Sequence, residues 1–412
     1  MATLQGACII GQSGGPTAVI NSSAYGAIRA ALDSPDITAV IGALHGIRGV
    51  LDEKLIDLSK EDPSELAYMR NTPSSLLGSC RYKLKDPDVD DTDYRKILDV
   101  FRKHNVRYFF YNGGNDSMDT CNKISKYMQT VGYECRIMGI PKTIDNDLFG
   151  TDHCPGYGSA AKYVATSTME VARDSRVYDK GMVTILEVMG RHAGWLTAAA
   201  ALAVPSGDGP DFIYLPERPF EMRRFLDDVE TRFREKGNVI VAVSEGIQDA
   251  DGRFVAEFGR EEDARDAFGH AQLGGLAATL AHIVKQQLDV KVRGIEFSLL
   301  QRCAAHLASK TDVDEAELAG RVAVEHAVAG DTDKMIAFER TSQSPYRCGI
   351  KLLPLAEVAN VEKKLPDEWI NYAGNGLRDE FIEYALPLIQ GEADRVCAGG
   401  LPRFASLSRH LL

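Results

Sequence analysis

Short apolar runs alternate with amphipathic stretches along most of this chain, which is typical of strands that alternate with helices. The apolar runs predict strands at residues 7–10, 37–44, 106–111, 182–188, 211–215, 239–243 and 291–297. The amphipathic stretches predict helices at residues 117–129, 160–173, 193–203, 220–236 and within 299–329. We therefore expect an α/β fold with mostly parallel sheets flanked by helices.

Three segments fit this alternation poorly. Residues 52–99 are charged and interrupted by prolines, residues 246–266 read as an acidic loop, and the tail after Tyr346 has weak periodicity. We expect all three to lie at the periphery. The chain has 412 residues, more than one compact core usually holds, so we also expect two domains.

Composition excludes some classes of function. A net charge of −12 argues against a nucleic-acid surface, which would need a basic patch. The 8 cysteines are scattered without a Cys-x-x-Cys pair, which indicates reduced thiols and a cytoplasmic location. The sequence contains no recognisable signal peptide and no apolar run long enough to cross a bilayer, so we expect no membrane contact.

Glycine-rich turns follow two of the predicted strands. Ser13, Gly14 and Gly15 form one turn, and residues 113–117 form the other. A strand–turn–helix unit presents backbone N–H groups and the positive end of a helix dipole to a phosphate, although a tight turn alone also explains each motif. Because the carboxyl ends of parallel strands meet at one crevice, the two turns together favour a shared anion site.

The loop at residues 139–147 is the most informative stretch, since it combines a lysine, a hydroxyl, an amide and two carboxylates. Asp and Asn also form ordinary turns, so a purely structural loop is the alternative interpretation. Phosphoryl transfer to a hydroxyl needs a carboxylate that accepts the proton and cations that neutralise the moving charge. Asp145 is the candidate base and Lys142 the candidate cation.

Charged residues at later strand ends extend this site. Arg191 lies near a predicted helix start, where the dipole disfavours a cation, so an anionic partner is the better explanation. Glu245 follows another strand and either forms a salt bridge or accepts sugar hydroxyls. From their pattern alone, Arg293 and the pair Gln301 and Arg302 are ordinary surface residues.

These motifs, in this order, resemble those of the phosphofructokinase family over about residues 5–330. Pro-x-Thr-Ile-Asp-Asn-Asp is highly specific to that family, whereas Gly-Gly-x-Asp-Ser also occurs in lipid and NAD kinases. The resemblance implies two Rossmann-like lobes with the active site in the cleft between them. It implies an N-terminal phosphoryl-donor lobe of residues 1–150 and about 302–345, and a sugar-phosphate lobe of about 151–301 with part of the tail.

The resemblance also implies roles for individual residues. Asp145 would take the proton from the 1-hydroxyl of fructose 6-phosphate, and Arg191 would stabilise the transferring phosphoryl group. The sugar phosphate would contact Thr143, Ile144, Asp145, Met189, Gly190, Arg191, Glu245, Arg293, Gln301 and Arg302. The donor would contact Gly15, Arg81, Asp116 and Lys142. Because Arg293 would reach over from a neighbouring subunit, the resemblance implies a homodimer or homotetramer with active sites completed across the interface.

The donor is expected to be pyrophosphate. Asp116 and Lys142 stand where ATP-using relatives carry glycine, and their side chains would fill the room that a nucleotide needs. This pairing resembles the pyrophosphate-dependent branch, whose reaction with fructose 6-phosphate is reversible. An ATP-dependent 6-phosphofructokinase is the alternative, and a longer acceptor such as sedoheptulose 7-phosphate stays open.

Magnesium is the implied cofactor, because bare pyrophosphate is too charged for a nucleophile to approach easily. The candidate ligands are Asp147 and Asn115, which stands where relatives usually have a magnesium-linked aspartate and offers a weaker, neutral oxygen. Asn115, and Met182 in place of a phosphate-binding arginine, leave a second possibility: a non-catalytic regulatory subunit that binds a sugar phosphate.

Overall fold

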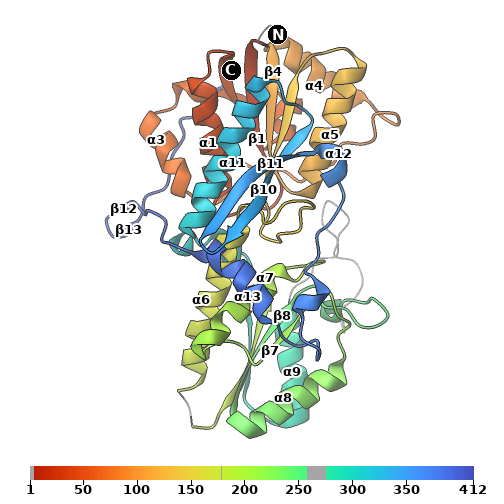
Figure 1. Ribbon diagram of the computed structural model, residues 1–412, viewed down its shortest axis with the longest axis vertical. Helices are drawn as coiled ribbons and strands as arrows, with labels where there is room; N and C mark the ends of the chain where they lie inside the picture. The colour runs from red at the N-terminus through yellow and green to blue at the C-terminus, as the bar shows by residue number, and fades with distance from the viewer. Residues whose placement is uncertain (1–3, 178, 258–274) are drawn as a thin grey trace.

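The computed structural model describes residues 4–177, 179–257 and 275–412. The molecule is elongated, with one helix-covered sheet in the upper half of Figure 1 and a second in the lower half. Most strand pairs in both sheets are parallel. The expected α/β fold with mostly parallel sheets flanked by helices is therefore confirmed.

The larger sheet has the strand order β11-β10-β5-β4-β1-β2-β3. Its strands are β1 (Gly6–Gln12), β2 (Ile37–Ala43), β3 (Leu55–Asp57), β4 (Val106–Gly113), β5 (Arg136–Pro141), β10 (Lys334–Gln343) and β11 (Tyr346–Pro354). The edge strands β3 and β11 are antiparallel to their neighbours, and the remaining pairs are parallel. As a result, β1, β4 and β5 end at the same edge of the sheet.

Both faces of this sheet are apolar, as a parallel sheet covered on two sides requires. Successive side chains of a strand point to opposite faces, and in β1 Ile9 belongs to one core while Ile10 belongs to the other. One face is covered by α2 (Ile47–Leu51), α4 (Thr92–Lys103) and α5 (Asn115–Thr130). The other face is covered by α1 (Ile20–Asp33), α3 (Pro63–Tyr68) and α11 (Lys310–Ala329).

The smaller sheet has the order β7-β8-β6-β9. Its strands, all parallel, are β6 (Met182–Val188), β7 (Phe212–Tyr214), β8 (Asn238–Ser244) and β9 (Val292–Glu296). One face packs on α8 (Met222–Lys236) and α9 (Leu276–Leu288). The other packs on α6 (Tyr157–Ser175), α7 (Trp195–Ala198) and α13 (Asp379–Ala385). The helix expected at 193–203 is instead the short α7 followed by a 3₁₀ helix over Ala199–Ser206.

The expectation that residues 52–99 lie at the periphery was wrong. This segment supplies β3, α3 and the start of α4, and its Ile56, Leu66 and Tyr94 are buried in the cores of the larger sheet. The prolines that suggested loops fit the structure, since Pro63 is the first residue of α3, where a missing N–H costs nothing. Of the acidic stretch 246–266, residues 258–266 lie outside the described residues.

The tail after Tyr346 is also not peripheral. It begins with β11, which completes a hairpin with β10 at the edge of the larger sheet, so the boundary expected near residue 345 falls in the hairpin turn. The chain then passes α12 (Leu355–Val358), reaches α13 in the lower half, and returns upward. The short helix α10 (Leu300–Cys303) follows β9 in the chain. The end of the chain pairs with β3 through the amide of Leu412, which donates to the carbonyl of Leu55. The last strands, β12 (Cys397–Ala398) and β13 (Leu401–Pro402), form a small exposed hairpin.

The division into two domains stays a prediction.

Candidate active site

The polar turns after β1, β4 and β5 lie side by side. The amide of Ser13 donates to the carbonyl of Asn112 at 2.9 Å, and the amide of Lys142 donates to the carbonyl of Gly113 at 3.0 Å. The three turns therefore face one cavity of about 520 Å³. The predicted site residues that line this cavity are Gly15, Arg81, Asn115, Asp116, Lys142, Thr143, Asp145, Asp147 and Arg191.

The loop after β5 turns sharply at Asn146, which has a left-handed backbone with φ of 55°. Asparagine tolerates this conformation better than most residues. Its buried side chain accepts a hydrogen bond from the amide of Cys154 at 2.9 Å and donates one to the hydroxyl of Tyr384 at 2.8 Å. This anchored turn lets Asp145 and Asp147 both face the cavity.

Burial dominates the chemistry of both carboxylates. It raises the pKa of Asp145 to about 7, an effect that Asp147 and Glu245 increase and Lys142 opposes. Burial also raises the pKa of Asp147, with a further contribution from Glu362. A carboxylate whose pKa lies near neutral pH is well matched to accepting and returning a proton.

Lys142 lies deeper in the site, with 3% of its surface exposed. Its Nζ atom donates to the carbonyl oxygen of Gly15 at 2.6 Å, which ties the loop after β5 to the turn after β1. Burial lowers the pKa of Lys142 to about 8, although Asp145 and Asp147 counteract this shift. The site therefore holds a buried ammonium beside two buried carboxylates.

Asp116 lies at the more open end of the cavity, where Lys83 is 4.0 Å from its carboxylate. Lys83 and the adjacent Tyr82 line the cavity but were missed in the sequence analysis. The basic residues that follow Arg81 were the available signal, because an anion site needs locally concentrated cations.

Asn115 and Asp147 could hold a hard cation. The Oδ1 atom of Asn115 is buried and has no hydrogen-bond partner among the described residues, while its Nδ2 atom lies 3.4 Å from Oδ2 of Asp147. The amide oxygen of Asn115 and the carboxylate of Asp147 are ligand types that Mg²⁺ accepts. These residues therefore fit the expected metal, with Asn115 as the neutral ligand.

Four more residues predicted to bind the sugar are joined by hydrogen bonds near Arg191. The amide of Gly190 donates to Glu245 at 3.4 Å, and the amide of Met189 donates to Gln301 at 3.2 Å. Burial raises the pKa of Glu245. These contacts form a connected set at the carboxyl end of β6, next to Arg191, which does reach the cavity.

Three further predicted residues are also absent from the cavity lining. Ile144 packs in the apolar core of the smaller sheet, with 8% of its surface exposed. Arg302 is close by, since its Nη1 atom would lie 3.3 Å from a Cβ placed on Gly15. Arg293 is half exposed on β9, and its Nη1 atom is 3.6 Å from Asp174. Within this chain, Arg293 does not belong to the site.

His192, Asn360 and Glu362 also line the cavity and were missed in the sequence analysis. His192 could have been found, because it directly follows Arg191 in the same turn. Asn360 and Glu362 come from the tail, which carried no pattern that pointed to the site.

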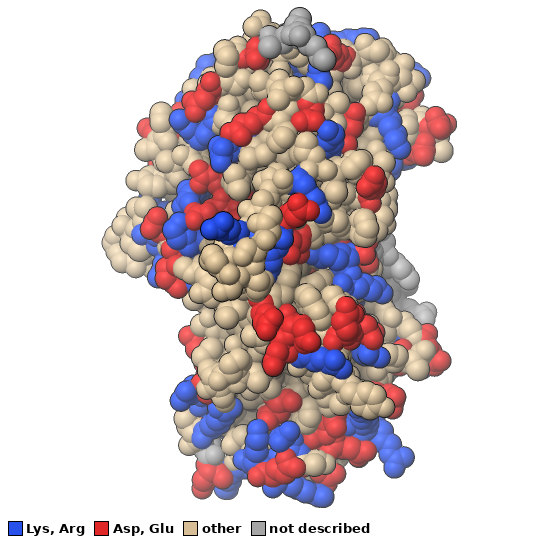
Figure 2. Space-filling view, in the orientation of Figure 1, with Lys and Arg blue, Asp and Glu red and all other residues tan. Residues whose placement is uncertain are grey.

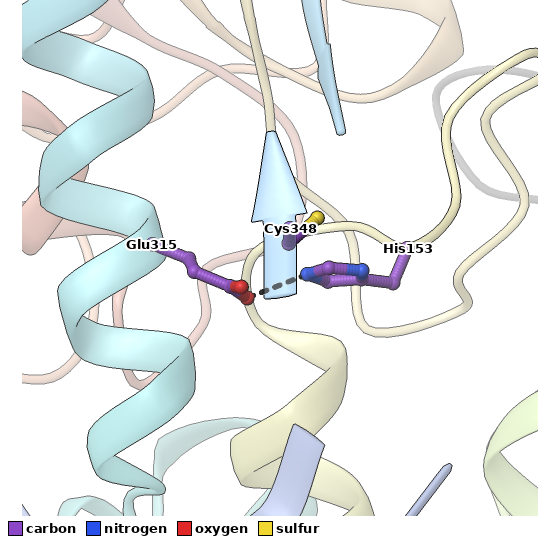
Figure 3. Close-up of side chains that lie close together, drawn as sticks. All are labelled: His153, Glu315 and Cys348. Atoms are coloured by element: carbon purple, nitrogen blue, oxygen red, sulfur yellow. Dashed lines mark hydrogen bonds and ion pairs between the residues drawn. The ribbon is translucent and has the colours of Figure 1, made fainter. Parts of the chain in front are cut away.

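A second cluster of candidate metal ligands lies elsewhere, between α11 and β11. The ligand atoms of His153, Glu315 and Cys348 lie within 4.8 Å of one another (Figure 3). Both ring nitrogens of His153 face carboxylates, with Asp152 at 2.8 Å and Glu315 at 2.6 Å, so neither is free to bind a metal. Burial raises the pKa of the Cys348 thiol to about 12. This cluster is a buried charge network and does not suit magnesium.

Charge is mixed on one face of the molecule. On the face shown in Figure 2, basic and acidic side chains are interspersed and form no broad basic stripe. Among the described residues, none of the helices combines the length and the apolar character that crossing a membrane requires.

Comparison with known proteins agrees with the geometry. A model of the phosphofructokinase family matches residues 7–295. The chain is 47% identical over 403 residues to the pyrophosphate–fructose 6-phosphate 1-phosphotransferase of Halomonas elongata, covering 97% of this chain and 95% of the relative.

Solved structures give the same result. The pyrophosphate-dependent phosphofructokinase of Marinobacter aquaeolei superposes with a TM-score of 0.87 at 42% identity, covering 98% of this chain and 97% of that one. The enzyme of the same description from Nitrosospira multiformis superposes with a TM-score of 0.89 at 41% identity, covering 99% and 98%. This chain belongs to the phosphofructokinase family. Within the family, its similarity to pyrophosphate-dependent enzymes extends over nearly the whole chain.

Proposed function

We propose that this protein transfers a phosphoryl group reversibly from pyrophosphate to the 1-hydroxyl of fructose 6-phosphate, a step of glycolysis. The observation that carries the proposal is the buried pair at the centre of the cavity, in which Lys142 and Asp145 lie at the meeting point of three polar turns. The names of the relatives that match almost end to end support the choice of donor.

In the proposed reaction, Asp145 accepts the proton of the sugar 1-hydroxyl while the oxygen of that hydroxyl attacks the nearer phosphorus atom of pyrophosphate. A new O–P bond forms, the bridging P–O bond breaks, and its electron pair leaves with inorganic phosphate. Lys142 and Arg191 neutralise the charge that spreads over the transferring group. In the reverse direction, Asp145 returns the proton to the sugar oxygen.

The donor end is assigned to Gly15, Arg81, Asp116 and Lys142. Two features support the exclusion of a nucleotide: Lys142 is tied down against Gly15, and Asp116 with Lys83 occupies the open end. The sugar end is assigned to Thr143, Arg191 and Arg302, together with the connected set of Met189, Gly190, Glu245 and Gln301.

Magnesium is the proposed cofactor, with Asn115 and Asp147 as the residues that would hold it. When bound, it would neutralise charge on the donor. Calorimetric titration with MgCl₂ tests the assignment apart from catalysis, since Asn115→Ala should weaken metal binding while Asn71→Ala, outside the cavity, should not.

The donor assignment is tested by assaying the purified enzyme with pyrophosphate and with ATP at the same fructose 6-phosphate concentration. Turnover with pyrophosphate should far exceed turnover with ATP, and the reverse result would overturn the assignment. A wild type that is inactive with both donors would favour a regulatory subunit. An assay with sedoheptulose 7-phosphate as a second acceptor tests whether the site tolerates a longer sugar.

We also propose that the protein is a cytoplasmic homodimer or homotetramer in which Arg293 reaches a neighbouring active site. Its half-exposed position outside its own cavity supports this role. Mixing inactive Arg293→Ala with inactive Asp145→Asn protein should restore part of the activity, because some mixed sites would contain both wild-type residues. If no mixture regains activity, Arg293 acts within its own chain or has no role.

A further inference from the structure

The tail segment 360–363 forms one wall of the cavity. Asn360 and Glu362 both line it, opposite the turns of the larger sheet. Asn360 has a left-handed backbone with φ of 63°, and its Nδ2 atom donates to Asp119 of α5 at 3.1 Å. A non-glycine residue holds this conformation only where its surroundings fix it. The segment is therefore anchored where it enters the site.

The same segment is bonded to the loop that carries the proposed base. Glu362 forms a backbone bridge with Leu148, and the amide of Lys363 donates to the carbonyl of Asp147 at 2.7 Å. The Nζ atom of Lys363 donates to the carbonyls of Thr151 and Asp152 at 3.1 and 2.8 Å. These bonds extend over residues 147–152, which directly follow the proposed base.

On its other side, the segment is bonded to the turn that carries Arg191. The carboxylate of Glu362 lies 3.0 Å from Nδ1 of His192. The indole Nε1 of Trp195 donates to the carbonyl of Lys363 at 3.0 Å, and the ammonium of Lys363 lies 4.8 Å from the centre of the Trp195 ring. The segment thus bridges the catalytic loop and the arginine turn.

The charge of Glu362 needs an explanation, because a carboxylate on the wall of an anion site repels a phosphate. Its contact with Nδ1 of His192 fixes the residue next to Arg191. A neutral side chain would avoid the repulsion but would form a weaker hydrogen bond with His192. The carboxylate is therefore better explained by its hold on His192 than by contact with the donor.

We propose that Glu362 is a positioning residue for phosphoryl transfer. Its backbone bridge fixes Leu148, which follows Asp147 in the chain, and its carboxylate fixes His192, which follows Arg191. Glu362 thereby sets the spacing between the two loops that bind the transferring group. This inference rests on the proposed function and concerns the transition state more than substrate binding. Small displacements of catalytic groups cost far more in kcat than in affinity.

The test is Glu362→Gln, which keeps the shape and the backbone bridge but removes the charge. We expect kcat with pyrophosphate to fall about 10-fold to 100-fold, while KM for fructose 6-phosphate changes less than about twofold. His192→Gln should give a similar loss, and the double variant should be no worse than either single one, because all three lack the same pair.

The matched control is Asp367→Asn, also in the tail, which removes an exposed ion pair with Arg218 at 2.8 Å. It should keep wild-type kcat, and all variants should melt within a few degrees of wild type. Wild-type kcat in Glu362→Gln, additive losses in the double variant, or parallel losses of kcat and melting temperature would each overturn the inference. A wild type without pyrophosphate activity would instead overturn the proposed function, and this inference with it.

Discussion

The Nζ atom of Lys142 lies 2.6 Å from the carbonyl oxygen of Gly15, so an ammonium from the loop after β5 is fixed to the turn after β1. An ammonium carries three N–H donors, so this bond orients the group and leaves others for a phosphate oxygen. The lysine is also buried, and its charge acts in surroundings where it is weakly screened.

Removing this charge should impair use of pyrophosphate. We expect Lys142→Met, which preserves most of the volume, to lower kcat/KM for pyrophosphate about 100-fold or more, as loss of an aligned electrostatic group does in other enzymes. Steady-state assays at pH 7 measure the effect. Lys103→Met, which removes an exposed ion pair with Glu53, is the control. Equal kinetics in the two variants would show that Lys142 has no role with the donor.

The pH dependence of turnover should have two limbs. Asp145 must be ionised to accept a proton, and its pKa of about 7 predicts that kcat/KM falls as pH drops below 7. Lys142 must be charged, and its pKa of about 8 predicts a second fall above pH 8. A pH profile of wild type and Lys142→Arg measures both limbs. The alkaline fall should move upward in the arginine variant, and an unmoved limb would assign it to another group.

Ionised Asp145 should lower the stability of the fold. Because burial raises the pKa of Asp145 above its ordinary value of 3.8, the folded state holds the proton more tightly than the unfolded state. Its contribution to stability is therefore lost progressively as pH rises from about 4 to about 7. Asp145→Asn should melt at a higher temperature than wild type at pH 8, with little difference at pH 4, while losing nearly all turnover. A variant that is less stable at pH 8 would contradict this.

His153 should contribute stability that is also lost as pH rises, but over a higher pH range. Burial alone would lower its pKa, but Glu315 and Asp152 outweigh burial and raise it to about 9, above the ordinary 6.5. The stability that these contacts add is complete below pH 6.5 and is lost as pH rises through 9. His153→Gln should therefore lower the melting temperature most near pH 6. Calorimetry across pH measures this, and a deficit that grows above pH 9 would refute the assignment.

Close packing of α1 on α11 should depend on Gly26. A Cβ atom added there would lie 2.1 Å from the backbone carbonyl oxygen of Glu317, which cannot move away without shifting the helix. We expect Gly26→Ala to destabilise the fold by about 1–3 kcal/mol, the usual cost of overpacking. Gly349→Ala, whose added Cβ would meet nothing nearer than 3.8 Å, is the control in urea denaturation. Equal stability of the two variants would count against the packing argument.

The strands β1 and β4, whose turns meet the loop of the proposed base, could be predicted from the sequence for a simple physical reason. Strands buried on both faces are nearly continuous apolar runs, so β1, β4 and β6 were visible, and the polar turns that follow them mark the sheet edge where ligands bind. Asp145, Lys142 and Asp116 were accordingly placed on turns that the structure brings to one cavity.

The tail could not be predicted in the same way. Residues 360–363 have no regular structure, and their partners, Leu148 and His192, lie far away in sequence. No local periodicity encodes such contacts, since they arise only after both sheets have formed. The hairpin of β10 and β11 was missed for a related reason: none of the 9 residues of β11 is fully buried, so the strand lacks a clear apolar run.

The bridging role of residues 360–363 has a consequence for protein synthesis. A nascent chain emerges from the ribosome with its first residues leading, so both catalytic turns exist long before the segment that closes the pocket between them. Premature termination anywhere before residue 363 would leave an incomplete pocket, even where most of both sheets had already folded.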